Sequence, residues 1–83
     1  MRRDKDEVIA EILNICTKGV SKTHIVYQAN LNFGTVDPYL KILIKNNLIE
    51  IYTDKHIRYR TTERGINLMK SINQLQNNLS EPV

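Results

Sequence analysis

Residues 21–50, SKTHIVYQANLNFGTVDPYLKILIKNNLIE, contain two helical patterns separated by a short polar turn. The first, over 22–29, places three apolar residues on one face: Ile25, Val26 and Ala29. The second, over 33–46, carries a stripe of four: Val36, Leu40, Leu43 and Ile44. A short helix, a tight turn and a longer helix are typical of a helix-turn-helix pair.

Ser21 and Asn32 are the expected N-caps of the two helices. Pro38 leaves two alternatives for the second helix. Inside the helix it removes one backbone hydrogen bond and collides with the carbonyl of Gly34, which would kink it. Otherwise residues 33–36 form a separate turn and a regular helix begins at Pro38, with Asp37 as its cap. We favour one helix that begins after Asn32.

Helical spacing also marks residues 4–17, where Lys18 and Gly19 end the pattern. After residues 46–47 the period changes to two, which predicts strands over 48–53 and 57–61 joined by a polar turn. In the second strand one face is expected to carry Ile57, Tyr59 and Thr61, and the other Arg58 and Arg60. Lone Cys16 lies on the apolar face of the first helix, where we expect it to be buried.

The last helical pattern covers residues 63–79, with Thr62 as the expected N-cap. Four apolar residues spaced by 4, 3 and 4 form a seam: Leu68, Ile72, Leu75 and Leu79. The seam fits either docking on the first helix of the same chain or pairing with a second copy. A helix of about 17 residues is about 25 Å long, more than so small a core can cover. We therefore expect a homodimer.

The order α-α-α-β-β-α predicts a mainly α fold with a small β-hairpin, a winged helix-turn-helix. The 83 residues suffice for one domain. We assign residues 1–62 to DNA binding and residues 63–83 to a C-terminal dimerisation helix within that domain. Residues 22–25 (KTHI), 30–33 (NLNF), 39–50 (YLKILIKNNLIE) and 59–65 (YRTTERG) resemble archaeal winged-helix regulators, in particular small chromatin-type proteins that dimerise through a long C-terminal helix. Pro38 and the shorter last helix depart from that pattern.

The net charge of +3 and the pI of about 9.2 favour a polyanionic partner, and the basic residues gather in the middle of the chain. We expect double-stranded DNA to be contacted by Lys18, Ser21, Lys22, Thr23, Asn32, Gly34, Thr35, Lys41, Lys45, Lys55, Arg58 and Arg60. The first half of the second helix of the pair offers no arginine to contact guanine, so base readout is expected to be modest or biased to AT-rich sites. The alternatives are solvated surface lysines, a plain capping role for Asn32, and a protein-interaction module that does not bind DNA.

Other classes of function lack their signatures. His24 and His56 are 32 residues apart and Cys16 has no second cysteine, so no metal site is expected. The three glycines form no phosphate-binding loop, and no nucleophile and base are paired, so we expect no enzyme, cofactor or small-molecule ligand. No signal peptide or membrane span is visible. The expectation is a cytoplasmic, nucleoid-associated protein acting as a transcriptional regulator or small chromatin protein.

Overall fold

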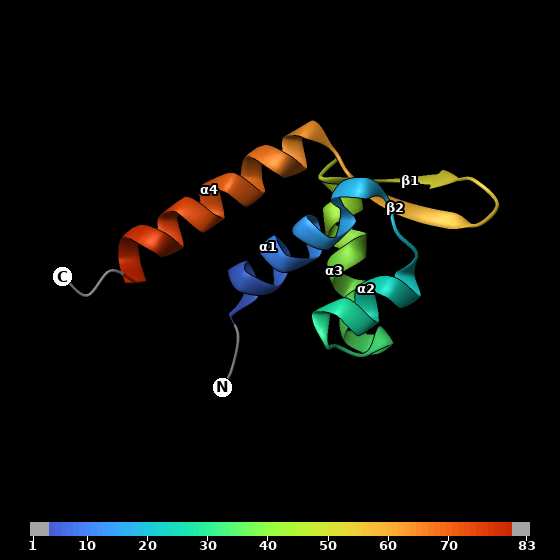
Figure 1. Cartoon of the computed structure of the whole chain (residues 1–83), viewed down its shortest axis with the longest axis horizontal. Coiled ribbons are helices and arrows are strands. Elements are labelled where there is room, and N and C mark those ends of the chain that lie inside the picture. Colours follow the sequence, from blue (N-terminus) through green and yellow to red (C-terminus); the bar gives the residue numbers. More distant parts are fainter. Residues whose placement is uncertain (1–3, 81–83) are drawn as a thin grey trace.

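The computed structural model describes residues 4–80, with side chains as far as Leu75. The elements are α1 (Lys5–Ile15), a 3-10 turn (Cys16–Lys18), α2 (Lys22–Ala29), α3 (Phe33–Lys45), β1 (Ile49–Thr53), β2 (Ile57–Thr61) and α4 (Glu63–Ser80). Figure 1 shows α1, α2 and α3 gathered together, the β1–β2 hairpin projecting to one side, and α4 lying beside α1. This order confirms the predicted winged helix-turn-helix.

Each α-helix begins at a side chain that accepts a hydrogen bond from a backbone amide three residues later. The pairs are Asp4 with Glu7, Ser21 with His24, Asn32 with Thr35, and Thr62 with Gly65, at donor–acceptor distances of 2.8 to 3.2 Å. The three predicted N-caps are thus confirmed. Asp4 was expected inside the first helix but lies just before it, because its carboxylate is used as the cap.

Pro38 lies within one helix, because α3 runs from Phe33 to Lys45. The favoured alternative is confirmed, and the separate turn over residues 33–36 is wrong. The cap at Asn32 starts the helix one turn before the proline. Buried residues Val36 and Leu40 then anchor it on both sides of Pro38, which is itself exposed. Their burial offsets the hydrogen bond that the proline cannot donate.

The core lies where α1, α2, α3 and the base of the hairpin meet. Its fully buried side chains are Ile12, Leu13, Cys16, Ile25, Val36, Leu43 and Ile49. The predicted burial of Cys16 is confirmed. Leu48, expected in the first strand, precedes β1 because its amide donates to the carbonyl of Leu43 at the end of α3. The first helix is also shorter than expected: it ends at Ile15, and Gly19 (φ +84°) closes the 3-10 turn.

The hairpin is fixed to the helices by backbone and side-chain bonds. β1 and β2 are antiparallel, in a register that pairs Ile49 with Thr61 and Thr53 with Ile57. Val20, just before α2, exchanges two backbone hydrogen bonds with Tyr59 of β2, at 2.7 and 3.0 Å. A two-stranded hairpin is marginal alone, so these bonds hold the wing against the segment that precedes α2.

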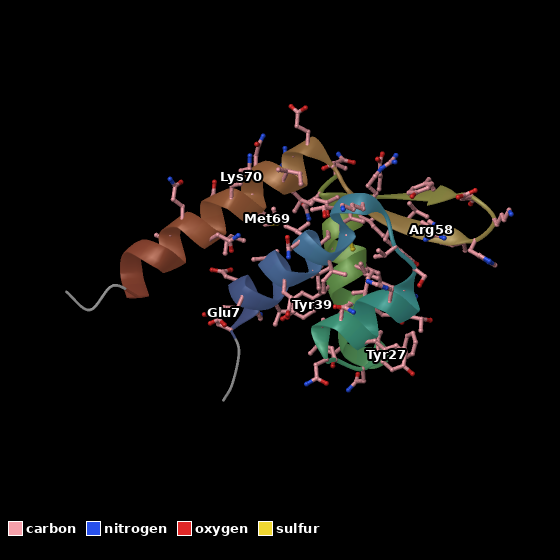
Figure 2. The ribbon with its side chains drawn as sticks, in the orientation of Figure 1. Glu7, Tyr27, Tyr39, Arg58, Met69 and Lys70 are labelled. Atoms are coloured by element: carbon pink, nitrogen blue, oxygen red, sulfur yellow. The ribbon has the colours of Figure 1, made fainter. Side chains whose placement is uncertain are left out.

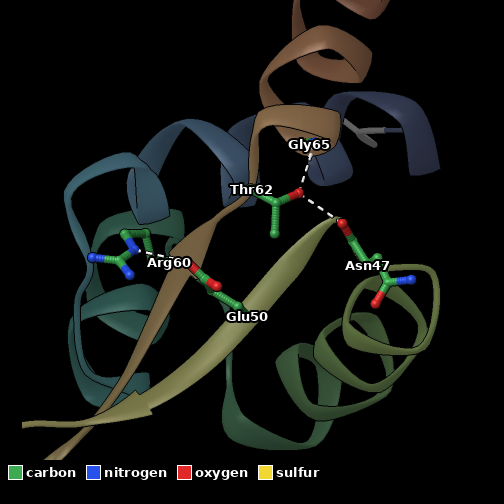
Figure 3. A network of polar contacts seen from close by, with 5 residues as sticks. All are labelled: Asn47, Glu50, Arg60, Thr62 and Gly65. Carbon is green, nitrogen blue, oxygen red and sulfur yellow. Dashed lines mark hydrogen bonds and ion pairs between the residues drawn. The ribbon is translucent and has the colours of Figure 1, made fainter.

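A polar junction connects the wing to α4 (Figure 3). Thr62 Oγ1 donates to the carbonyl of Asn47 at 2.6 Å and accepts from the amide of Gly65 at 3.0 Å. A Cβ at position 65 would collide with the backbone carbonyl of Leu48 and lie 2.6 Å from Thr61 Cγ2. Only glycine therefore fits at this point, and the close approach sets where α4 leaves the wing.

Candidate nucleic-acid interface

The start of α2 lies close to β2, the second strand of the wing. An antiparallel bridge joins Val20 to Tyr59. Ser21 follows Val20, and Arg58 precedes Tyr59 in β2, so the bridge holds the start of α2 near Arg58. The fold thus brings the predicted phosphate contacts of α2 close to those of the wing, although 36 residues separate Lys22 from Arg58 in the sequence.

Lys22 connects the two helices of the helix-turn-helix pair. Its Nζ lies 2.7 Å from Asp37 Oδ1 of α3, with exposed side-chain fractions of 35% and 44%. The hydrogen bond from Lys22 to Asp37 is the largest of the effects that raise the pKa of Lys22, and nearby Tyr59 raises it further. Three elements, α2, α3 and β2, thus meet around one ammonium group that water still reaches.

The wing presents its two arginines differently. Arg60 Nε donates to Glu50 Oε2 at 2.9 Å, and its guanidinium lies 4.5 Å from the centre of the Tyr52 ring. Its charge is therefore already balanced within the wing (Figure 3). Arg58, paired across the strands with Tyr52, is half-buried and forms no ion pair with another described residue. Lys55 is exposed in the turn between the strands.

The outward face of α3 carries residues spaced by 4, 3 and 4: Gly34, Pro38, Lys41 and Lys45, all of them exposed. At Gly34, an added Cβ would meet only Asn32 Oδ1, at 3.3 Å. This face can therefore approach a partner closely at its beginning and meets it with two ammonium groups one and two turns later. The remaining predicted contact on α3, Thr35, is half-buried.

None of the twelve predicted DNA contacts is buried. Lys18 and Thr23 are exposed beside the start of α2, whereas Ser21 is half-buried. Ser21 and Asn32 both act as caps, as the alternative for Asn32 anticipated. The predicted residues thus form two groups that the fold connects through Lys22: one at α2 and β2, the other along α3.

Sequence reasoning missed two side-chain contacts within this surface and the exposure of two aromatic residues. The pairing of Asp37 with Lys22 links residues 15 positions apart, and no local period signals it. Tyr52 was not recognised as the ring beneath Arg60. Tyr27 and Phe33 are 80% and 49% exposed, although aromatic side chains usually lie inside. The only available signal was their position outside the two apolar stripes.

The predicted seam of α4 is divided. Leu68 is half-buried and contacts the core of its own chain, as does neighbouring Met69. Ile72 is half-buried, and Leu75 is 55% exposed. The side chain of Leu79 lies outside the described residues. Figure 1 shows α4 beside α1 and projecting away from the rest of the chain.

A mainly apolar hollow of about 300 Å³ lies between α1 and α3, lined by Lys5, Ile9, Pro38, Tyr39, Ile42 and Leu43. Over residues 4–80, no group of three or more histidine, cysteine or carboxylate side chains is placed to hold a metal ion. Nor is any helix in that range long and apolar enough to cross a membrane.

Comparison with known proteins agrees with this architecture. Residues 2–80 match the winged helix-turn-helix family model. Uncharacterized protein MJ0287 from Methanocaldococcus jannaschii is 37% identical over 75 residues, covering 89% of this chain and 74% of that protein. The crystal structure of Sso10a-2, a DNA-binding protein from Sulfolobus solfataricus, matches with a TM-score of 0.82 and 28% identity, covering 94% of this chain and 86% of that one. The chain therefore belongs to an archaeal winged helix-turn-helix family.

Proposed function

We propose that this protein binds double-stranded DNA through α2, α3 and the wing, and that it does so as a homodimer. The observation that carries the proposal is the meeting of α2, α3 and β2 around Lys22, with Arg58 next to Tyr59 in β2. The similarity to Sso10a-2, described as a DNA-binding protein, supports it.

In the proposed complex, α3 lies in the major groove with its first half toward the base edges. The start of α2 faces phosphate, where its free backbone amides and helix dipole favour an anion. Lys41 and Lys45 on α3 and Arg58 on the wing supply further phosphate contacts. Most of the affinity then comes from phosphate neutralisation, since Asn32 serves as a cap and Asp37 is paired with Lys22.

The dimer is proposed to form through the second half of α4, within residues 63–83. Leu75 is 55% exposed, and a second copy would cover it. A two-fold dimer would present two copies of α3 to two half-sites. Such a protein would act in the nucleoid as a transcriptional regulator if its sites are specific, or as a small chromatin protein if they are not.

Binding is tested by fluorescence anisotropy with an AT-rich duplex across a salt series. We expect affinity to fall steeply with salt, with a log–log slope of roughly 0.9 per neutralised phosphate. Lys41→Ala should lower the slope by about one contact per protomer, and therefore by about two per bound dimer. Lys70→Ala, which removes the same charge from an exposed site on α4 (Figure 2), is the matched control and should leave the slope unchanged. Absence of binding at low salt would overturn the proposal.

The dimer is tested by sedimentation equilibrium at micromolar concentration. We expect a dimer for the natural chain and a monomer for Leu75→Asp. Asn73→Asp adds the same charge to α4 at an exposed position outside the seam, so this control should remain dimeric. A monomeric natural chain would refute the proposed assembly without affecting the test of DNA binding.

A second candidate function is a protein-interaction module without DNA binding. The apolar hollow between α1 and α3 favours it, because Ile42 at its edge is 57% exposed and exposed apolar surface often marks interaction sites. Failure to bind any duplex at low salt, with the chain folded by circular dichroism, would favour this function over the first.

A further inference from the structure

The first two turns of α3 have few free polar groups to offer a base. The Asn32 side chain accepts from the Thr35 amide at 2.8 Å, and Asp37 is held by Lys22 at 2.7 Å. Thr35 is half-buried. The exposed side chains that remain in these turns, Phe33 and Pro38, are apolar. Few polar side chains at this end of α3 are therefore free to form hydrogen bonds with bases.

Phe33 is the largest of these apolar groups and is 49% exposed at the first position of α3. Helical side chains tilt toward the N-terminus, so its ring projects at the leading end of the helix. Gly34 beside it has no side chain, so nothing at that position shields the ring. The ring is thus free to contact whatever faces the start of α3.

In the major groove, the apolar group that a base edge presents is the C5-methyl of thymine. We propose that Phe33 recognises thymine methyl groups in the major groove, which makes thymine-rich DNA the preferred ligand. This inference rests on the proposed DNA binding and specifies what the start of α3 recognises. Apolar contact, rather than hydrogen bonding, then supplies the sequence preference.

The test compares two alternating duplexes of equal length, one of A·T pairs and one of A·U pairs, in the same anisotropy assay. Uracil lacks only the methyl group, so phosphate charge and base pairing are retained. We expect the natural chain to bind the thymine duplex more tightly, by roughly three- to fourfold for each methyl contacted. Phe33→Ala should bring this ratio close to one, and Phe33→Leu, which keeps an apolar side chain, should retain most of it.

Tyr27→Ala is the matched control, because it removes an aromatic ring that is 80% exposed on α2 (Figure 2). It should leave the thymine-to-uracil ratio unchanged. Equal binding of both duplexes by the natural chain would overturn the inference while leaving DNA binding intact. A ratio that survives in Phe33→Ala, or that is lost in Tyr27→Ala, would also overturn the assignment to Phe33. No binding to either duplex would instead refute the proposed function itself.

Discussion

Lys22 Nζ of α2 lies 2.7 Å from Asp37 Oδ1 of α3, so the proposed DNA-binding surface contains a carboxylate bonded to one of its own cations. Both side chains are more than a third exposed, and ion pairs of this kind contribute about 0–1 kcal/mol to stability. Separating Lys22 from Asp37 therefore costs little free energy. Lys22 can turn to a phosphate, but Asp37 then remains as an unpaired negative charge beside the DNA.

We predict that Asp37→Asn raises affinity for all duplexes several-fold, because it removes that repulsion and frees Lys22. The free energy of unfolding should change by less than about 1 kcal/mol. Anisotropy titrations at two salt concentrations and urea denaturation measure the two quantities. Weaker binding confined to sites with cytosine would contradict this prediction and would show that Asp37 accepts a hydrogen bond from the cytosine amino group.

The wing arginines are predicted to contribute unequally. Arg58→Ala should lower the salt slope by about one contact per protomer, because Arg58 has no carboxylate partner among the described residues. The matched change is the double variant Arg60→Ala with Glu50→Gln, which removes a bonded pair and leaves the net charge unchanged. Its slope should stay near that of the natural chain. An equal decrease of the salt slope in Arg58→Ala and in the double variant would show that Arg60 leaves Glu50 to contact DNA.

The fold was predictable because its signals are local. Helical and strand periods gave each element, and short polar side chains before apolar stripes gave the N-caps, such as Ser21 and Thr62. Contacts between elements were not predictable in this way. Lys22 meets Asp37 only because α2 and α3 cross, and Leu68 lies on its own chain although the seam pattern fits a partner equally well. Periodicity identifies an apolar face but not what covers it.

Cys16 is predicted to report on unfolding. Its side chain is fully buried, and burial raises the pKa of its thiol from 9.0 to about 12. A thiol-reactive dye at pH 8 should therefore react slowly with the folded chain and rapidly in denaturant. Because the unfolded thiol loses its proton first, stability should fall as pH rises from 9 toward 12. In Cys16→Ala this contribution to the decline should vanish, and fast labelling of the folded chain would contradict burial.

Gly65→Ala is predicted to destabilise the chain by roughly 2–3 kcal/mol through overpacking. The new methyl group would collide with the backbone carbonyl of Leu48, which accepts from the amide of Thr62 and cannot move without breaking that bond. Gly34→Ala is the control, because its Cβ meets only the end of the Asn32 side chain, at 3.3 Å. There the gain in helix propensity, up to about 1 kcal/mol, is offset by displacement of the capping oxygen of Asn32, so stability should change little. Urea denaturation of both variants at one protein concentration tests the contrast, and equal effects would show that the junction of the wing and α4 can shift to admit a side chain.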